Sequence, residues 1–115
     1  MFDFEKLNVY QKASIFNCAI YSFLSQYKNI DKAYRDQLRR ASFSIPLNIA
    51  EGSGRFSKAD KKHFYIIAIG SAFECVAILD QLKRMQLISE ETYNEKHVMA
   101  FEMTNMLFGL QKSLS

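Results

Sequence analysis

The chain has 115 residues, of which 49% are hydrophobic and 23% are charged, with a formal net charge of +3. This length corresponds to one domain with a single core, so residues 1–115 are predicted to form one domain. The absence of a polar low-complexity run excludes an intrinsically disordered protein. The N-terminal stretch has acidic residues before its first lysine and no long apolar run, unlike a secretion signal or a membrane span. We therefore expect a cytoplasmic protein that does not contact a membrane.

Apolar residues at helical spacing predict a first helix from about Phe4 to Tyr27, with Asp3 as its N-cap. Its expected core residues are Val9, Ala13, Phe16, Ile20, Phe23 and Leu24. A second helix is expected from about Asp31 to the run Gly52-Ser53-Gly54. Glycine can adopt the left-handed conformation that ends a helix without a side-chain clash, so this run marks the helix end.

The second helix carries apolar stripes on two opposite sides. One is the expected core stripe, which contains Tyr34, Leu38, Ala41, Ile45 and Ile49. The other contains Phe43, Leu47 and Ala50. Pro46 stands within this pattern, where it removes a backbone donor and crowds the carbonyl of Ser42. A second apolar stripe predicts a contact beyond the core of the monomer.

Ser57 is the predicted N-cap of a third helix from about Lys58 to Met85, with Asp60 favoured by the helix dipole. Ser89, followed by two glutamates, marks the start of a fourth helix. No segment shows the alternating pattern of a strand. Short connections between long helices favour antiparallel neighbours. We therefore predict an all-α protein with an up-down-up-down antiparallel four-helix bundle.

The third helix is apolar around most of its circumference. One face holds Phe64, Ile67, Ala68, Cys75, Ile78, Leu79 and Leu82, and a second face holds Ile66, Ile69, Phe73, Val76 and Ala77. A four-helix monomer cannot cover both faces, and exposed apolar patches usually mark association, so we predict a homo-oligomer. The expected interface anchors are Phe43, Leu47, Ile66 and Phe73. The alternative is a monomer with scattered apolar residues on its surface.

The positive charge is concentrated between Lys28 and Lys62, where nine basic residues occur with four acidic ones. That segment has a local charge of +5, which leaves −2 for the rest of the chain. Basic residues at this density can neutralise the phosphates of RNA or DNA. The candidate phosphate contacts are Arg35, Arg39, Arg40, Arg55, Lys58, Lys61 and Lys62. The alternative is a set of solvated helix faces, with Asp36 paired to Arg40 and Glu51 to Arg55.

Two polar stripes are predicted to face each other. The second helix carries Gln37, Arg40, Ser44, Asn48, Glu51 and Arg55, and the third helix carries His63, Gly70, Glu74 and Gln81. We expect a buried polar network in which Asn48 and Glu51 satisfy backbone groups freed by Pro46 and by the helix end. Capture of a ligand by the same residues is the alternative.

Enzyme chemistry has little support in the pattern. Cys18 and Cys75 lack the spacing of a zinc or redox site and are expected to be thiols, with Cys75 on the core face. Asp60 and His63 show the spacing of a metal-binding helix motif once only, beside lysines that would repel a cation. No serine or cysteine has a plausible base beside it in sequence. We therefore expect no catalytic residue, no metal and no cofactor.

The run QLRRASFSIPLNIAEGSGR, followed by FYIIAIGSAFE, resembles the bacterial four-helix-bundle family of ribosomal-RNA intervening-sequence proteins. The same family includes the accessory protein of diversity-generating retroelements. The resemblance implies a closed homopentameric barrel of helical bundles with a nucleic-acid-binding role. One position departs from the family pattern, because Ile69 stands where members often have a basic residue.

These observations predict a non-enzymatic, oligomeric protein that binds RNA or DNA phosphates through a basic surface on the assembly. The alternative is an interaction scaffold that docks a protein partner, such as a reverse transcriptase if the chain belongs to the retroelement branch. Salt-dependent binding of nucleic acid would distinguish the first function from the second.

Overall fold

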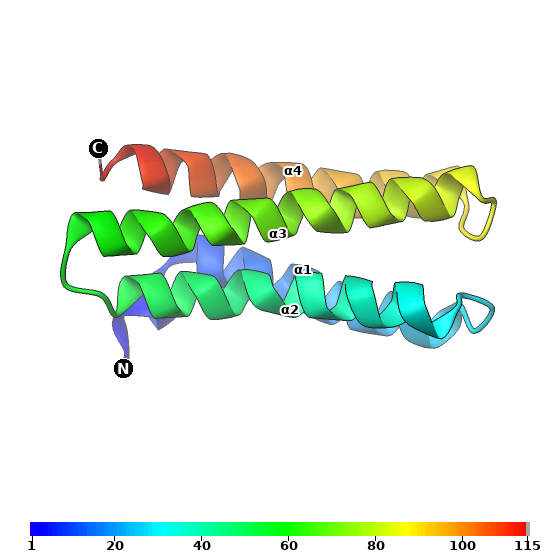
Figure 1. The fold of residues 1–115 in the computed structure, drawn as a ribbon, viewed down its shortest axis with the longest axis horizontal. Helices are drawn as coiled ribbons and strands as arrows, with labels where there is room; N and C mark the ends of the chain where they lie inside the picture. Colours follow the sequence, from blue (N-terminus) through cyan, green and yellow to red (C-terminus); the bar gives the residue numbers. More distant parts are fainter. Residues whose placement is uncertain (115) are drawn as a thin grey trace.

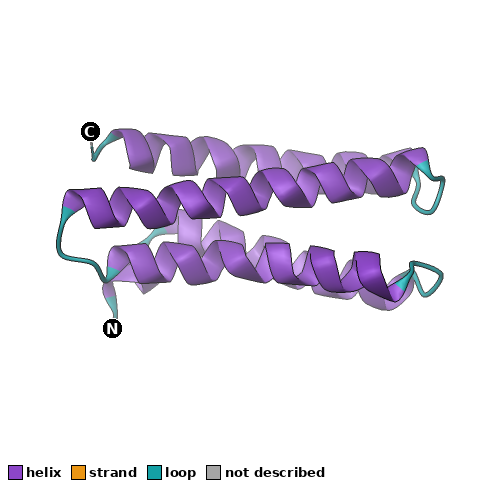
Figure 2. Cartoon of the chain, viewed as in Figure 1, coloured by secondary structure: helices purple, strands orange, loops and turns teal. Residues whose placement is uncertain are grey.

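The computed structural model describes residues 1–114 and contains helices joined by loops. A short 3-10 helix, η1 (Asp3–Lys6), precedes α1 (Asn8–Gln26), α2 (Lys32–Ser53), α3 (Lys58–Arg84) and α4 (Glu90–Lys112). Consecutive α-helices run antiparallel in Figure 1, and short loops join them in Figure 2. α1 and α3 each pack against both α2 and α4. The predicted all-α four-helix bundle is therefore confirmed for the single chain.

The N-termini of α3 and α4 are capped by the side chains that the sequence indicated. Ser57 Oγ accepts a hydrogen bond from the backbone N–H of Asp60 at 3.0 Å. Ser89 Oγ accepts one from the N–H of Thr92, also at 3.0 Å. Each bond satisfies a donor that has no partner within the first turn of a helix. Both predicted N-caps are confirmed.

The predicted first helix is interrupted near its start. Asp3 begins η1 rather than capping a long helix, and the extended backbone at Leu7 separates η1 from α1. Leu7 provides no side-chain hydrogen bond to the first turn of α1. The prediction of Asp3 as the N-cap is therefore wrong, because η1 packs against α2 as well as α1 and leaves the axis of α1.

The glycine run after α2 does not adopt the predicted left-handed conformation. Gly54 has φ −84° and ψ −4°, and its N–H donates to the Ala50 carbonyl. Lys61 Nζ donates to the Ser53 carbonyl at 2.9 Å, so a side chain from α3 satisfies the last turn of α2. The prediction was wrong because the N–H groups of Gly54 and Arg55 reach the carbonyls of the last turn from right-handed backbone, so no left-handed residue is needed.

The left-handed residue lies instead at the end of α3. Gln86 has φ 60°, and within residues 1–114 no other non-glycine residue and no glycine has a positive φ. The N–H groups of Gln86 and Leu87 donate to the carbonyls of Lys83 and Leu82, respectively. This pair of bonds is a Schellman motif, which ends a helix and usually contains glycine at the left-handed position. Because this position holds glutamine, nothing in the sequence indicated a left-handed residue at the end of α3.

The core contains the predicted stripes of α1 and α2 and a rotated stripe of α3. Every expected core residue of α1 is buried, as are Leu38, Ala41, Ile45 and Ile49 of α2, whereas Tyr34 is 39% exposed. On α3 the predicted core residue Ile67 is 37% exposed, while Ile69, assigned to the second face, is buried. The buried arc is rotated because α3 packs against α4 as well as α2.

Within residues 1–114, α3 is the one helix that is long and apolar enough to cross a membrane, with a mean hydropathy of 1.5. The core helix of a helical bundle meets the same criterion of length and composition. α3 lies between α2 and α4 in Figure 1, and its Ala68, Cys75 and Leu79 side chains are fully buried. The hydropathy of α3 therefore reflects a core face combined with a further apolar face at the surface.

α2 packs closely against α3 at Gly52, where there is no room for a larger side chain. A Cβ added at Gly52 would lie 2.9 Å from Phe64 Cβ, 2.9 Å from Tyr65 Cε1 and 3.2 Å from the Lys61 carbonyl oxygen. We expect Gly52→Ala to lower the free energy of unfolding by about 1–3 kcal/mol, the usual cost of overpacking. Urea denaturation followed by circular dichroism measures this change.

Gly109→Ala is the matched control, because nothing lies within 4 Å of a Cβ added at Gly109. Alanine is a better helix former than glycine, so this variant should gain about 0.5–1 kcal/mol. If Gly52→Ala were as stable as Gly109→Ala, the close packing at Gly52 would be contradicted.

Candidate nucleic-acid interface

The seven basic residues predicted to contact phosphates lie on two surfaces rather than one. Arg35, Arg39 and Arg40 lie in the first half of α2, whereas the other four lie at the α2–α3 connection or in the first turns of α3. At a rise of about 1.5 Å per residue, Arg39 and Arg55 are about 24 Å apart along the bundle. In Figure 1 the α2–α3 connection lies at the same end as both termini, and the α1–α2 connection lies at the opposite end.

Arg35 holds the C-terminus of α1. Its Nη1 donates to the Tyr27 carbonyl at 2.7 Å, and its Nη2 donates to the Leu24 carbonyl at 2.5 Å. These carbonyls belong to the last turn of α1, which a cation stabilises through the helix dipole. The side chain predicted as a phosphate contact is therefore engaged in a structural role within the bundle.

Two of the basic side chains near the α2–α3 connection also form contacts within the bundle. Arg55 Nη2 lies 3.1 Å from Glu51 Oε2, which confirms the predicted ion pair, and the guanidinium stands 4.6 Å from the centre of the Phe64 ring. Lys61 donates to the Ser53 carbonyl, as described above. Lys58 is exposed and forms no ion pair within residues 1–114. Lys58 is thus the cation of this turn that is most available to an external anion.

Arg40 does not form the predicted ion pair with Asp36. The Asp36 carboxylate instead accepts a hydrogen bond from Lys32 Nζ at 2.6 Å, one turn in the other direction. This bond, with further attraction from Lys32, Arg39 and Arg40, holds the pKa of Asp36 below its usual value. Asp36 therefore pairs with Lys32, and the Arg40 side chain remains exposed without an ion pair to Asp36.

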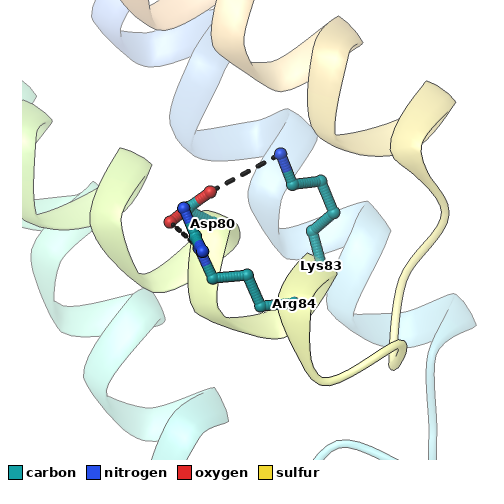
Figure 3. A network of polar contacts seen from close by, with 3 residues as sticks. All are labelled: Asp80, Lys83 and Arg84. Carbon is teal, nitrogen blue, oxygen red and sulfur yellow. Dashed lines mark hydrogen bonds and ion pairs between the residues drawn. The ribbon is translucent and has the colours of Figure 1, made fainter.

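Arg39 and Arg40 differ from the other arginines in having no hydrogen-bond acceptor. Arg84 shows the contrast in Figure 3, where its Nε lies 2.8 Å from Asp80 Oδ2 and Lys83 Nζ lies 3.5 Å from Asp80 Oδ1. Arg40 makes no ion pair or hydrogen bond within residues 1–114, and Arg39 makes only a contact with the ring of Tyr21, 6.0 Å from its centre. Their guanidinium groups are free to bind an anion bidentately.

A groove of about 580 Å³ adjoins these two arginines between α1 and α2. Besides Arg39 and Arg40, its lining includes Asn17, Cys18, Tyr21 and Phe43. The sequence analysis did not assign Asn17 or Tyr21 to a site. Their spacing of four residues on α1 placed them on one helix face, but nothing in the sequence indicated that this face adjoins Arg39.

The predicted polar network between α2 and α3 forms only in part. Ser71 Oγ donates to Ser44 Oγ at 2.9 Å, and Gln37 Nε2 donates to Glu74 Oε2 at 2.6 Å. Arg40 instead lines the groove beside α1. All four members of the α3 stripe are exposed, namely His63, Gly70, Glu74 and Gln81.

Asn48 and Glu51 do not have the predicted roles at backbone groups freed by Pro46. α2 continues through Pro46, whose missing N–H would otherwise bond the Ser42 carbonyl. Asn48 Nδ2 donates to the Ser44 carbonyl at 2.8 Å and to Ser44 Oγ at 2.9 Å. Glu51 pairs with Arg55 rather than with a backbone group. Asn48 and Glu51 therefore form their contacts with residues one turn away.

The four predicted interface anchors all lie at the surface of the single chain. The exposed fractions of Phe43, Leu47, Ile66 and Phe73 are 54%, 51%, 49% and 59%. Phe73 lines an apolar groove of about 410 Å³ between α3 and α4. Its ring also packs edge-on against the ring of Phe108, with ring centres 6.4 Å apart. Exposure of this kind is what association through these side chains requires.

The acidic and thiol side chains do not assemble into a metal centre. Within residues 1–114, no group of three or more histidine, cysteine, aspartate or glutamate residues could hold a metal ion. Cys18 is exposed and Cys75 is buried, and neither forms a disulfide. Burial, with a smaller effect from the Glu74 charge, raises the pKa of the Cys75 thiol to about 12. Cys75 is therefore a packing residue with a protonated, unreactive thiol.

The fold and these surfaces define a helical-bundle protein with cationic and apolar residues displayed outside one core. A model of the 23S rRNA-intervening sequence protein family matches residues 5–109. That range is most of the chain, so this protein belongs to the 23S rRNA-intervening sequence protein family. No match was found among curated proteins.

A solved structure supports the same assignment. It is the crystal structure, at 1.70 Å resolution, of a protein of unknown function from the S23 ribosomal protein family of Bacteroides thetaiotaomicron VPI-5482. The two chains are 28% identical, the match covers 90% of this chain and 98% of that chain, and the TM-score is 0.83. The family that the sequence resembled is thereby confirmed, together with its helical-bundle fold.

The capping role of Arg35 predicts a loss of stability that Arg40 does not share. Arg35→Ala removes hydrogen bonds to two carbonyls at the end of α1, so the free energy of unfolding should fall by about 1–3 kcal/mol. Arg40→Ala is the matched control and should change it by less than about 0.5 kcal/mol. Urea denaturation measures both variants. Equal stabilities would contradict the role of Arg35 in the bundle.

Proposed function

We propose that this protein is a non-enzymatic nucleic-acid-binding protein of the bacterial cytoplasm, which contacts RNA or DNA phosphates chiefly through Arg39 and Arg40. The observation that carries this proposal is that, within residues 1–114, neither of these two exposed guanidinium groups forms a hydrogen bond or ion pair with a carboxylate or carbonyl group. Arginine binds phosphate oxygens through paired N–H donors, and adjacent arginines on one helix turn concentrate that capacity.

The distribution of charge supports the same proposal. The segment from Lys28 to Lys62 has a local charge of +5. Lys58 adds an exposed cation at the start of α3, which would give an extended nucleic-acid strand a second point of contact. Such contacts bind nucleic acid with little regard to sequence, through the release of counterions. The family takes its description from an intervening sequence of 23S rRNA, which makes ribosomal RNA the first nucleic acid to test.

We also propose that the active form is a homo-oligomer, and a pentamer by resemblance to the family. Four apolar side chains, each about half exposed, support association. A ring of chains would arrange several copies of the cationic segment around one axis and strengthen the attraction for a polyanion.

A second candidate function is a scaffold that docks a protein partner, such as a reverse transcriptase. The apolar groove between α3 and α4 favours it, because Phe73, Phe101 and Tyr93 line a surface suited to aromatic or aliphatic side chains. In that case the chain would assemble but would bind RNA weakly at all salt concentrations.

Salt dependence tests the nucleic-acid proposal. We expect the wild-type protein to bind a ribosomal RNA fragment with an affinity that falls steeply between about 50 mM and about 300 mM salt. Each phosphate contact contributes roughly 0.7–0.9 to the slope of log affinity against log salt. The double variant Arg39→Ala, Arg40→Ala should therefore lower the slope by more than one, as measured by fluorescence anisotropy.

The matched control removes the same charge elsewhere. Lys83 and Arg84 already pair with Asp80, so the double variant Lys83→Ala, Arg84→Ala should leave the slope within about 0.3 of the wild type. Binding that is lost equally in both double variants would show dependence on net charge alone and would contradict a role for the α2 arginines.

Assembly is tested by light scattering coupled to size exclusion. The wild type should elute as a multiple of its 13.4 kDa chain mass. The double variant Phe43→Ser, Leu47→Ser should shift towards the monomer, because it removes apolar area that association buries. Ile15→Ser is the control, since Ile15 is 60% exposed on α1 and is not among the predicted anchors. A monomeric wild type would refute the assembly.

A further inference from the structure

The groove between α1 and α2 has a polar floor and aromatic sides. Ser42, which is buried, lies at its floor with Oγ 3.0 Å from Asn17 Oδ1. Ser42 Oγ also lies 3.2 Å from the Arg39 carbonyl, and Asn17 Nδ2 has no hydrogen-bond partner within residues 1–114. The amide donors of Asn17 are thus available to a molecule that enters the groove.

The sides of the groove combine exposed rings with cations. Tyr21 of α1 is 63% exposed in the single chain, and Phe43 of α2, which is 54% exposed there, is also a predicted interface anchor. The guanidinium of Arg39 lies 6.0 Å from the centre of the Tyr21 ring, and Arg40 is the neighbouring residue. Asp36 also lines the groove, but its carboxylate is held by Lys32. The groove therefore offers an aromatic surface directly beside two guanidinium groups that form no ion pair within residues 1–114.

We propose that this groove binds one unpaired nucleotide of a single-stranded nucleic acid, with its base on the Tyr21 ring and its phosphate on Arg39 and Arg40. The inference rests on the proposed function and specifies the class of nucleic acid. Stacking of a base on an aromatic side chain beside a cationic groove is the usual way in which proteins hold single strands. The Asn17 amide donates to the edge of the base.

A duplex does not fit this arrangement. Paired bases are stacked on their neighbours, so their faces cannot reach a protein ring, and only an unpaired or flipped base can enter a groove. The volume of about 580 Å³ is within the range of sites that enclose a molecule of nucleotide size. Unpaired loops and ends of a structured RNA would therefore be the preferred targets.

Tyr21 is the residue to substitute, because Phe43 also belongs to the predicted interface. We expect Tyr21→Ala to weaken binding of a single-stranded RNA of about 12 nucleotides roughly tenfold in fluorescence anisotropy, and to change duplex binding less than about twofold. Tyr21→Phe retains the ring and should bind within about twofold of the wild type. Circular dichroism checks that each variant is folded.

Phe56→Ala is the matched control, since Phe56 is a fully exposed aromatic residue beside Arg55 but outside the groove. It should leave single-strand binding unchanged. If Phe56→Ala reduced binding as much as Tyr21→Ala did, the assignment of the base to the groove would be overturned.

Cys18 provides a second readout that does not depend on a variant. It is exposed and lines the groove, whereas Cys75 is buried and should not react in the folded chain. Alkylation of Cys18 by iodoacetamide should slow several-fold when the single-stranded RNA is bound, and mass spectrometry of the Cys18 peptide measures the rate. Equal protection by the duplex would contradict the inference.

The outcomes separate this inference from the function on which it rests. If the protein bound single strand and duplex with equal affinity, and Tyr21→Ala did not change that affinity, the base-binding role of the groove would be overturned. The proposed phosphate binding would remain. Failure to bind either RNA at low salt would overturn both. Uridine monophosphate is the remaining probe. If it bound as tightly as the single-stranded RNA, the groove would be a site for free nucleotides, and the inference that it binds a nucleic-acid strand would be overturned.

Discussion

α3 presents more apolar surface than a four-helix bundle can bury, and the organisation of the molecule follows from this constraint. The bundle encloses one side of α3, including Ala68, Cys75 and Leu79, between α2 and α4. Ile66 and Phe73 remain at the surface because no helix within residues 1–114 covers them. The same surplus explains the membrane-like hydropathy of α3 and the proposal that the chain assembles with copies of itself.

The arginines of this chain show how local partners decide what a charged side chain can do. Arg35 is engaged by carbonyl groups of α1, and Arg55 by a carboxylate one turn away. Within residues 1–114, the side chains of Arg39 and Arg40 hydrogen-bond neither kind of partner, and Lys32 binds the nearby carboxylate of Asp36. The net charge therefore overstates the number of cationic side chains that are available to an external anion. Hydrogen bonds within the bundle already engage some of the seven candidate residues.

Predictions from sequence succeeded where the interaction is local and failed where a distant segment supplies the partner. Ser57 and Ser89 cap helices through bonds to residues three positions away, so their roles could be read from the sequence. Gly54 was misassigned, and at the same helix end Lys61 of α3 donates to the Ser53 carbonyl. Gln86 carries the left-handed conformation without the glycine that usually signals it, and its conformation could not have been predicted.

The sequence by itself determined the family, the four helices and most of the core, because helical periodicity and caps depend on neighbours within one or two turns. It also indicated that Phe43, Leu47, Ile66 and Phe73 lie outside the core. Only the tertiary structure brought Tyr21 beside Arg39, since these residues lie on different helices and meet through the packing of α1 on α2. A groove is made by two surfaces, and its shape depends on how the helices dock rather than on the pattern within either one.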